Sequence, residues 1–266
     1  MHNNDQRFGG TERLYGVAAT HILREAHIAV VGIGGVGSWA AEALARTAIG
    51  EITLIDLDDI CVTNTNRQIH ALSNTIGKEK VTVMAERILQ INPQCKVNIV
   101  EDFVVADNVA ELLTRSMDYV IEATDSVQAK AAMIAHCKRQ KIPVITVGGA
   151  GGQTDPTQIQ VADLSKTIHD PLSSKLRSIL RKDYHFSSNS KRKFAVPCVF
   201  STEQLVYPQA DGSVCQTKNL SEGNVKLDCN GGFGASVAVT ATFGFVAAAR
   251  AIDKVIERQN AKQSLI

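Results

Sequence analysis

Three glycines and a following aspartate are the residues whose types and spacing best fit the binding of a nucleotide. Gly32, Gly34 and Gly37 form the pattern G-x-G-x-x-G between an apolar run at 29–31 and a helix-forming stretch. Such a loop presents backbone N–H groups to a nucleotide phosphate at a helix N-terminus. Asp56 lies nineteen residues after Gly37, where a carboxylate can accept hydrogen bonds from ribose hydroxyls. The motif predicts a nucleotide site without naming the nucleotide, and close packing of the glycines is the alternative interpretation.

Further polar residues follow two of the expected strands. Asn64 and Arg67 lie in a polar loop after the strand expected at 51–56, and Asp125 ends the strand expected at 118–125. Ligands of parallel sheets bind beyond the carboxyl ends of the strands. The side chains expected to converge on one pocket are therefore Asp56, Asn64, Arg67 and Asp125.

The elements that must position these residues alternate between apolar strands and helices. This alternation is typical of an α/β protein with a doubly wound, mainly parallel, Rossmann-like sheet. We expect one large domain, 1–266, with a nucleotide-binding core at 27–155. Strands are expected at 27–32, 51–56, 97–100, 118–125 and 143–147, with helices at 8–26, 36–47, 77–92, 107–115 and 126–140.

The alternation stops after the glycine-rich run at 148–152, so an irregular C-terminal half is expected. We assign 156–266 to the substrate side and to elements of a dimer. The expected elements there are a strand at 158–161, a helix at 171–183, short strands within 199–207 and 211–216, a helix of small residues at 230–249, and a charged tail at 250–258.

Composition points to an ordinary globular protein of the reducing cytoplasm. The net charge is +1, charged residues make up 21% of the chain, and its six cysteines form no C-x-x-C pair. A disulfide framework and a four-cysteine zinc site are therefore not expected. The N-terminus is polar and does not resemble a secretory signal.

The segment 230–249 contains no charged residue and is about as long as a membrane span requires. It is also rich in glycine, serine and threonine and poor in leucine and isoleucine. This composition favours a helix packed tightly within an α/β protein, and membrane association is the less favoured alternative.

The order of motifs resembles that of the ubiquitin-activating-enzyme-like adenylyltransferases, which include the activators of molybdopterin-synthase and thiazole-synthase sulfur carriers. The glycine loop is followed by Asp56, then N-x-x-R-Q at 64–68, Lys80, and Thr-Asp at 124–125. The resemblance covers roughly residues 7–161. It implies ATP as the nucleotide, with Mg²⁺, and it leaves open a bound monovalent cation, Na⁺ or K⁺.

The resemblance also implies individual roles. Arg67 and Lys80 would bind the ATP phosphates, and Asp125 would serve the magnesium–phosphate end of the site as the metal ligand. Arg13 would enter the site of a neighbouring subunit, so a homodimer is expected. The residues expected to bind or shape the pocket for ATP are Gly32, Gly34, Gly35, Gly37, Asp56, Asp58, Asn64 and Gln68.

The residues alone leave plainer roles open for each of the four proposed catalytic side chains. Arg67 and Lys80 could be ordinary surface charges, and Arg13 a solvated helix residue. Asp125 could be no more than a helix cap before Ser126.

The second half resembles the tRNA-modifying members of the family at 148–157 and in its basic run at 175–193. The implied activity is ATP-dependent dehydration of threonylcarbamoyladenosine in the tRNA anticodon loop. The carboxylate would be adenylated, and another atom of the same side chain would then close a ring. An NAD-dependent oxidoreductase is the alternative from another reaction class. Hydride transfer would not need the arginine and lysine that are expected to bind the phosphates.

An activator of a small sulfur-carrier protein is the alternative function. It would work with a cysteine desulfurase and accept sulfur on Cys229 or a neighbouring cysteine. Yet the zinc-binding cysteine pairs of the sulfur-carrier activators are absent. We interpret Cys198, Cys215 and Cys229 as small buried side chains, because none has a setting that would activate a thiol.

Basic residues between 171 and 195 are the expected contact to tRNA. Arg177 and Arg181 lie four apart on one helix face, and the serine-rich segment 187–193 is expected to be a mobile loop. A solvated face of the protein is the alternative interpretation. The basic residues are Lys175, Arg177, Arg181, Lys182, Lys191, Arg192 and Lys193.

Overall fold

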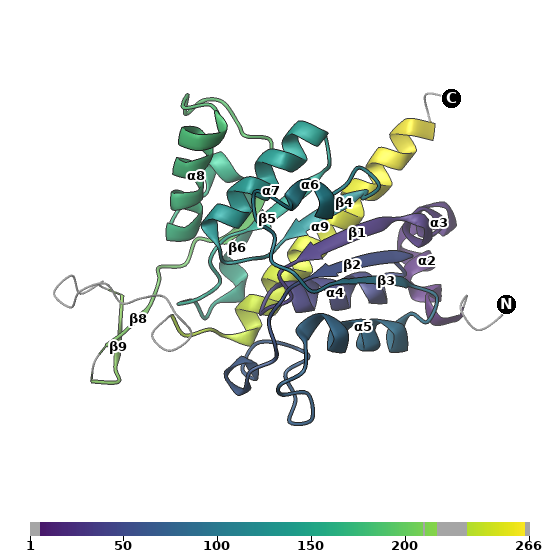
Figure 1. Ribbon diagram of the computed structural model, residues 1–266, viewed down its shortest axis with the longest axis horizontal. Helices are drawn as coiled ribbons and strands as arrows, with labels where there is room; N and C mark the ends of the chain where they lie inside the picture. The colour runs from purple at the N-terminus through teal and green to yellow at the C-terminus, as the bar shows by residue number, and fades with distance from the viewer. Residues whose placement is uncertain (1–5, 210, 217–232, 264–266) are drawn as a thin grey trace.

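A seven-stranded sheet forms the centre of the computed structural model, which describes residues 6–209, 211–216 and 233–263 (Figure 1). Its strand order is β3-β2-β1-β4-β5-β7-β6, and every pair is parallel except β6 with β7. The predicted class, a doubly wound and mainly parallel sheet, is confirmed. The strands are β1 His27–Val31, β2 Glu51–Ile55, β3 Lys96–Val100, β4 Tyr119–Glu122, β5 Val144–Val147, β6 Ile159–Asp163 and β7 Pro197–Ser201.

Helices cover both faces of the sheet because alternate strand residues point to opposite sides. In β1, Ile28 and Val30 belong to one core with residues of α3, α4, α5 and α9, whereas Ala29 and Val31 belong to a second core with residues of α6, α7 and α8. The helices are α2 Gly9–Tyr15, α3 Val17–Glu25, α4 Gly37–Arg46, α5 Lys80–Ile91, α6 Val109–Leu112, α7 Val127–Gln140, α8 Pro171–Tyr184 and α9 Val237–Gln263.

The C-terminal half is more regular at its centre than the sequence suggests. The strand expected within 199–207 begins earlier, as β7, and joins the main sheet beside β5. A separate two-stranded sheet follows, formed by β8 Tyr207–Pro208 and β9 Val214–Cys215.

From Val237 onward the small-residue stretch and the charged tail form one helix, α9, which passes behind the sheet against α4 (Figure 1). Of the helix expected at 230–249, residues 230–232 lie outside the described residues and 233–236 are not helical. Gly244 permits the close approach, because a Cβ there would lie 2.5 Å from the carbonyl oxygen of Val36. In the part of the chain that the structure describes, no helix is both long and apolar enough to cross a membrane.

Candidate functional site

The glycine loop between β1 and α4 has a backbone that only glycine accommodates at two positions. Gly32 has a φ of 86°, and a Cβ there would lie 2.8 Å from the carbonyl oxygen of Ala123. A Cβ on Gly37 would lie 1.8 Å from the carbonyl oxygen of Gly32. These contacts press the loop against the end of β4, and α4 begins with no side-chain cap on its N–H groups.

The carboxylate of Asp56 fixes the loop from the neighbouring strand. Its Oδ2 accepts a hydrogen bond from the backbone N–H of Ile33 at 2.6 Å, and its Oδ1 accepts one from the N–H of Asp58 at 2.9 Å. Each carboxylate oxygen has further acceptor capacity, so hydrogen bonds to ribose hydroxyls remain available. The carbonyl of Ile33 lies 2.8 Å from Nε2 of the buried His70, so the backbone of Ile33 is held through both its N–H and its carbonyl.

His70 was not foreseen from the sequence as part of this site. Burial lowers its pKa, which favours the neutral ring, whose Nε2–H can donate to the carbonyl of Ile33. No pattern in a single sequence links His70 to a loop thirty-seven residues away. Neutral His70 therefore supports the glycine loop without adding a charge to it.

Lys80 is the first residue of α5, and its ammonium group reaches back to the loop that follows β2. Its Nζ lies 2.7 Å from Oδ2 of Asp58, with the lysine side chain 7% exposed and the aspartate side chain 55% exposed. The backbone N–H of Lys80 also donates to the carbonyl of Asp58. This burial excludes the interpretation of Lys80 as an ordinary surface charge.

Arg67 lies beside the glycine loop and is half-buried. A Cβ added to Gly35 would lie 3.3 Å from both Cγ and Cδ of Arg67. The guanidinium Nη1 donates to the carbonyl of Thr63 at 2.9 Å and to Oδ1 of Asn66 at 3.0 Å. The stem of Arg67 thus lies against the glycine loop, and its guanidinium is held by two residues of the polar loop.

Asn64 and Gln68 flank Arg67, and both are buried. The Asn64 side chain accepts a hydrogen bond from the N–H of Cys61 at 3.0 Å and so shapes the polar loop. The amide nitrogen of Gln68 would be 3.8 Å from a Cβ on Gly34, and its Oε1 has no hydrogen-bond partner among the described residues. Gln68 therefore offers a free acceptor next to the glycine loop.

Asp125 is exposed and follows β4, at the same sheet edge. The helix-cap interpretation is wrong, because Ser126 caps α7 by accepting a hydrogen bond from the N–H of Ala129. Glu122 fixes the turn before Asp125. Its Oε1 accepts a hydrogen bond from the backbone N–H of Thr124 at 2.9 Å and one from Oγ1 of Thr124 at 2.7 Å. Asp125 thus remains free to face a ligand.

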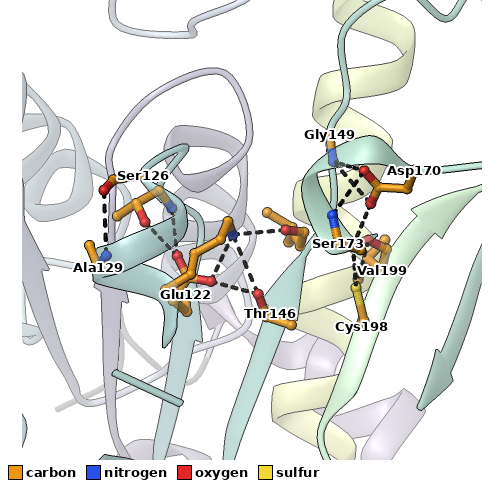
Figure 2. A network of polar contacts seen from close by, with 12 residues as sticks. Glu122, Ser126, Ala129, Thr146, Gly149, Asp170, Ser173, Cys198 and Val199 are labelled. Carbon is orange, nitrogen blue, oxygen red and sulfur yellow. Dashed lines mark hydrogen bonds and ion pairs between the residues drawn. The ribbon is translucent and has the colours of Figure 1, made fainter. Parts of the chain in front are cut away.

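A fully buried ion pair supports that turn, as Figure 2 shows. Nζ of Lys130 lies 2.7 Å from Oε2 of Glu122 and donates to the carbonyl of Val147 at 2.8 Å. Thr146 donates to the same Oε2 at 2.6 Å. One feature of the sequence indicates this network, namely Glu122 within an otherwise apolar strand. The sequence does not identify the partners of Glu122.

Asp170 organises the glycine-rich segment that follows β5 (Figure 2). Its carboxylate accepts hydrogen bonds from the N–H groups of Gly149, Leu172 and Ser173, so it both caps α8 and holds the glycines. A Cβ on Gly148 would meet the carboxylate of Asp170. Gly148 is therefore required by this close approach, whereas a Cβ on Gly149 would make only ordinary contacts, 3.5 Å from Oδ1 of Asp170.

Three buried thiols in the described part of the chain are poor nucleophiles. Burial raises the pKa of Cys95, Cys137 and Cys198 to about 12, so each is protonated near neutral pH. The prediction that Cys198 is a buried side chain is confirmed, whereas Cys215 is exposed and its predicted burial is wrong. Cys229 lies outside the described residues.

Comparison with known proteins agrees with this geometry. The ThiF family model matches residues 11–265. The chain belongs to the ThiF family. The resemblance to adenylyltransferases that the motifs indicated is thereby confirmed over nearly the whole chain.

Two similar proteins of high identity carry the same name. The tRNA threonylcarbamoyladenosine dehydratase of Escherichia coli strain K12 is 63% identical over 253 residues, covering 95% of this chain and 94% of the relative. The Haemophilus influenzae protein of the same name is 58% identical over 97% of this chain and 96% of its own. A crystal structure of the E. coli dehydratase in complex with ATP has a TM-score of 0.87, with 57% identity over 99% of this chain and 98% of that one.

Among the predicted site residues that the structure describes, Arg13 lies away from the glycine loop. Arg13 lies exposed on α2, near the amino ends of the strands (Figure 1). The loops of the site follow the carboxyl ends of the strands, at the opposite end of the sheet. Leu14 and Val17 beside Arg13 are 75% and 73% exposed. The position is compatible with a contact to a second subunit, which stays a proposal.

Two of the basic residues expected to contact tRNA are engaged within the protein instead. Arg177 is half-buried, donates to Oγ1 of Thr167 and has its pKa lowered by burial. The guanidinium of Arg181 lies 5.4 Å from the centre of the Phe194 ring. Three consecutive basic residues of the following loop remain exposed, namely Lys191, Arg192 and Lys193.

Proposed function

We propose that this chain is an ATP-dependent enzyme that dehydrates threonylcarbamoyladenosine in tRNA by closing a ring. The observation that carries the proposal is the near full-length identity to dehydratases of that name. The site described above supports it, because it combines a glycine loop with the carboxylate proposed for the ribose and the two cations proposed for the phosphates.

The first chemical step is attack of the substrate carboxylate on the α-phosphate of ATP. Pyrophosphate leaves, and the carboxylate becomes an acyl adenylate. Negative charge grows on the phosphate oxygens in the transition state, and Arg67 and Lys80 stabilise it as preorganised cations. Lys80 is already held in place by Asp58, so little reorganisation is needed when ATP binds.

The second step is attack on the activated carbonyl by a nitrogen or oxygen of the same threonylcarbamoyl side chain. AMP leaves with one former carboxylate oxygen, and the attacking atom loses a proton, so the net change is loss of water. Neither step requires a thiol, which agrees with the protonated state of the buried Cys95, Cys137 and Cys198.

Asp125 is the proposed protein ligand of Mg²⁺. In the part of the chain that the structure describes, no three His, Cys, Asp or Glu side chains cluster as a metal site. This fits an ion bound through one or two carboxylates and the phosphates of the substrate. When bound there, Mg²⁺ would neutralise phosphate charge.

Isotope exchange between pyrophosphate and ATP can identify the substrate whose carboxylate is activated. Exchange that depends on tRNA carrying threonylcarbamoyladenosine supports the proposal. Exchange that depends instead on a small carrier protein would replace it with sulfur-carrier activation, the less favoured function. Mass analysis of tRNA nucleosides from a strain lacking the protein is the corresponding test in the cell, where the uncyclised nucleoside should accumulate.

The chain is proposed to act as a homodimer in the cytoplasm, with 27–155 as the ATP-binding core and 156–266 facing the substrate and the second subunit. A sulfur-accepting role for Cys229 with a cysteine desulfurase, and a monovalent cation, are compatible with this arrangement. Neither is needed for the two steps above.

Mixed dimers test whether Arg13 acts in the partner's site. An Arg13→Ala chain and an Arg67→Ala chain should each be nearly inactive alone. Their heterodimer should regain activity, because one of its two sites would combine an intact Arg67 with an intact Arg13 from the other subunit. Absence of recovery in purified heterodimers carrying two different tags would show that Arg13 does not act across subunits.

Replacing Lys191, Arg192 and Lys193 with alanine should weaken tRNA binding and flatten its dependence on salt. Basic contacts to phosphates release counterions, so removing them lowers the number of ions released. Binding titrations across a salt series measure the slope. The ATP affinity should stay unchanged.

The matched control is a triple alanine variant of Arg250, Lys254 and Lys262 on exposed parts of α9, which removes the same charge elsewhere. Its salt slope should equal that of the wild type. Equal slopes and affinities for both triple variants and the wild type would place the tRNA contact outside the 191–193 segment.

A further inference from the structure

Trp39, the single tryptophan of the chain, connects the first turn of α4 to the segment that carries Arg67. Its indole Nε1 donates a hydrogen bond to the backbone carbonyl of Arg67 at 2.9 Å. The carbonyl belongs to a turn between the 3-10 helix Val62–Asn64 and α5, so it lies outside the regular hydrogen bonds of a helix or sheet. The indole therefore provides a partner that the turn itself does not supply.

This bond completes a set of contacts that fix Arg67 from several directions. Its backbone N–H donates to the carbonyl of Asn64 at 3.0 Å, and its Nη1 donates to the carbonyl of Thr63. Its aliphatic stem lies against Gly35 of the glycine loop. With Trp39 donating to the carbonyl, both the backbone N–H and the backbone carbonyl of Arg67 are hydrogen-bonded next to the predicted phosphate position.

Trp39 also contacts α9. Its ring meets the ring of Phe245 edge to face, with centroids 5.8 Å apart and an interplanar angle of 77°. The neighbouring Gly244 lets α9 approach, since a Cβ there would lie 3.0 Å from Cβ of Trp39. The C-terminal helix thus packs against the ring of Trp39, and the N–H bond to Arg67 is a separate contact.

We propose that Trp39 is a positioning residue that places the Arg67 guanidinium for the phosphates of ATP. This inference rests on the proposed role of Arg67 in binding ATP. A Trp39→Phe variant keeps an aromatic ring next to Phe245 and removes only the N–H donor and part of the ring. Loss of one such hydrogen bond should weaken ATP binding by about fivefold.

A double-mutant cycle on ATP affinity tests the proposal, with Kd measured by calorimetry on the full-length protein. Trp39→Phe should weaken ATP binding about fivefold in the wild-type background and by less than about twofold in the Arg67→Ala background. A purely structural role for Trp39 would give the same factor in both backgrounds, because it would not depend on the guanidinium.

Phe245→Leu is the matched control, because it disturbs the aromatic pair and retains the indole donor. Its ATP Kd should stay within about twofold of the wild type. A loss equal to that of Trp39→Phe would assign the effect to packing and overturn the proposal, as would additive losses in the cycle. If Arg67→Ala itself leaves ATP affinity and turnover unchanged, the proposed role of Arg67 fails instead, so the two failures are distinguishable.

Discussion

Replacing Arg67 with alanine is expected to lower turnover by roughly 100-fold or more at saturating ATP, by analogy with the loss of an oxyanion-hole donor. The aliphatic stem of Arg67 lies against Gly35 of the glycine loop, where the phosphates of a nucleotide are predicted to bind. The guanidinium charge interacts more strongly with the transition state than with bound ATP, because negative charge grows on the phosphate oxygens during attack. Turnover should therefore fall more than ATP affinity does.

Single-turnover formation of AMP from ATP in the presence of modified tRNA measures this effect. Arg115→Ala is a suitable control, since Arg115 is exposed and bonds to Gln140 far from the pocket. Lys80→Ala should behave like Arg67→Ala, although it also leaves Asp58 without its cation. Near-normal turnover of Arg67→Ala at saturating ATP would mean that the phosphates bind elsewhere.

The first half of the site was predictable from sequence because its residues lie in one continuous βαβ unit. The glycine loop, Asp56 and Arg67 are linked by local rules of strand, turn and helix, and the structure places them together. The supports of these residues come from distant segments. His70 reaches Ile33, and Trp39 reaches the carbonyl of Arg67, through contacts that no local periodicity encodes.

The basic residues at 175–193 show another limit of prediction from sequence. The spacing of Arg177 and Arg181 correctly placed them on one helix, but spacing does not reveal what that face meets. Thr167 and Phe194 occupy it, so both arginines stabilise the packing of α8 instead of remaining free. Similarly, β7 enters the main sheet through long-range pairing with β5, which the local pattern near 199–207 did not specify.

Lys130→Met is expected to lower the free energy of unfolding by about 3–5 kcal/mol, the cost of leaving a buried charge without its partner. Glu122 and Lys130 are both fully buried, and the lysine also donates to the carbonyl of Val147. Methionine has a similar length and fills the space, so the main loss is electrostatic. Urea denaturation monitored by circular dichroism measures the change.

Lys254→Met is the matched control, because it breaks a lysine–glutamate pair of similar geometry on the exposed face of α9. It should leave the denaturation midpoint nearly unchanged, since solvent screens exposed pairs. An equally small effect of Lys130→Met would mean that the buried pair contributes little to the stability of the fold.

The double variant Glu122→Leu with Lys130→Met separates stability from positioning. Removing both charges should recover much of the lost stability, because the desolvation cost disappears with the pair. However, the N–H and hydroxyl of Thr124 would lose the acceptor that fixes the turn before Asp125. We therefore expect a stable protein whose turnover remains low, measured by AMP formation at saturating ATP. Wild-type turnover in a stable double variant would show that the buried pair serves folding alone and that Asp125 is positioned without it.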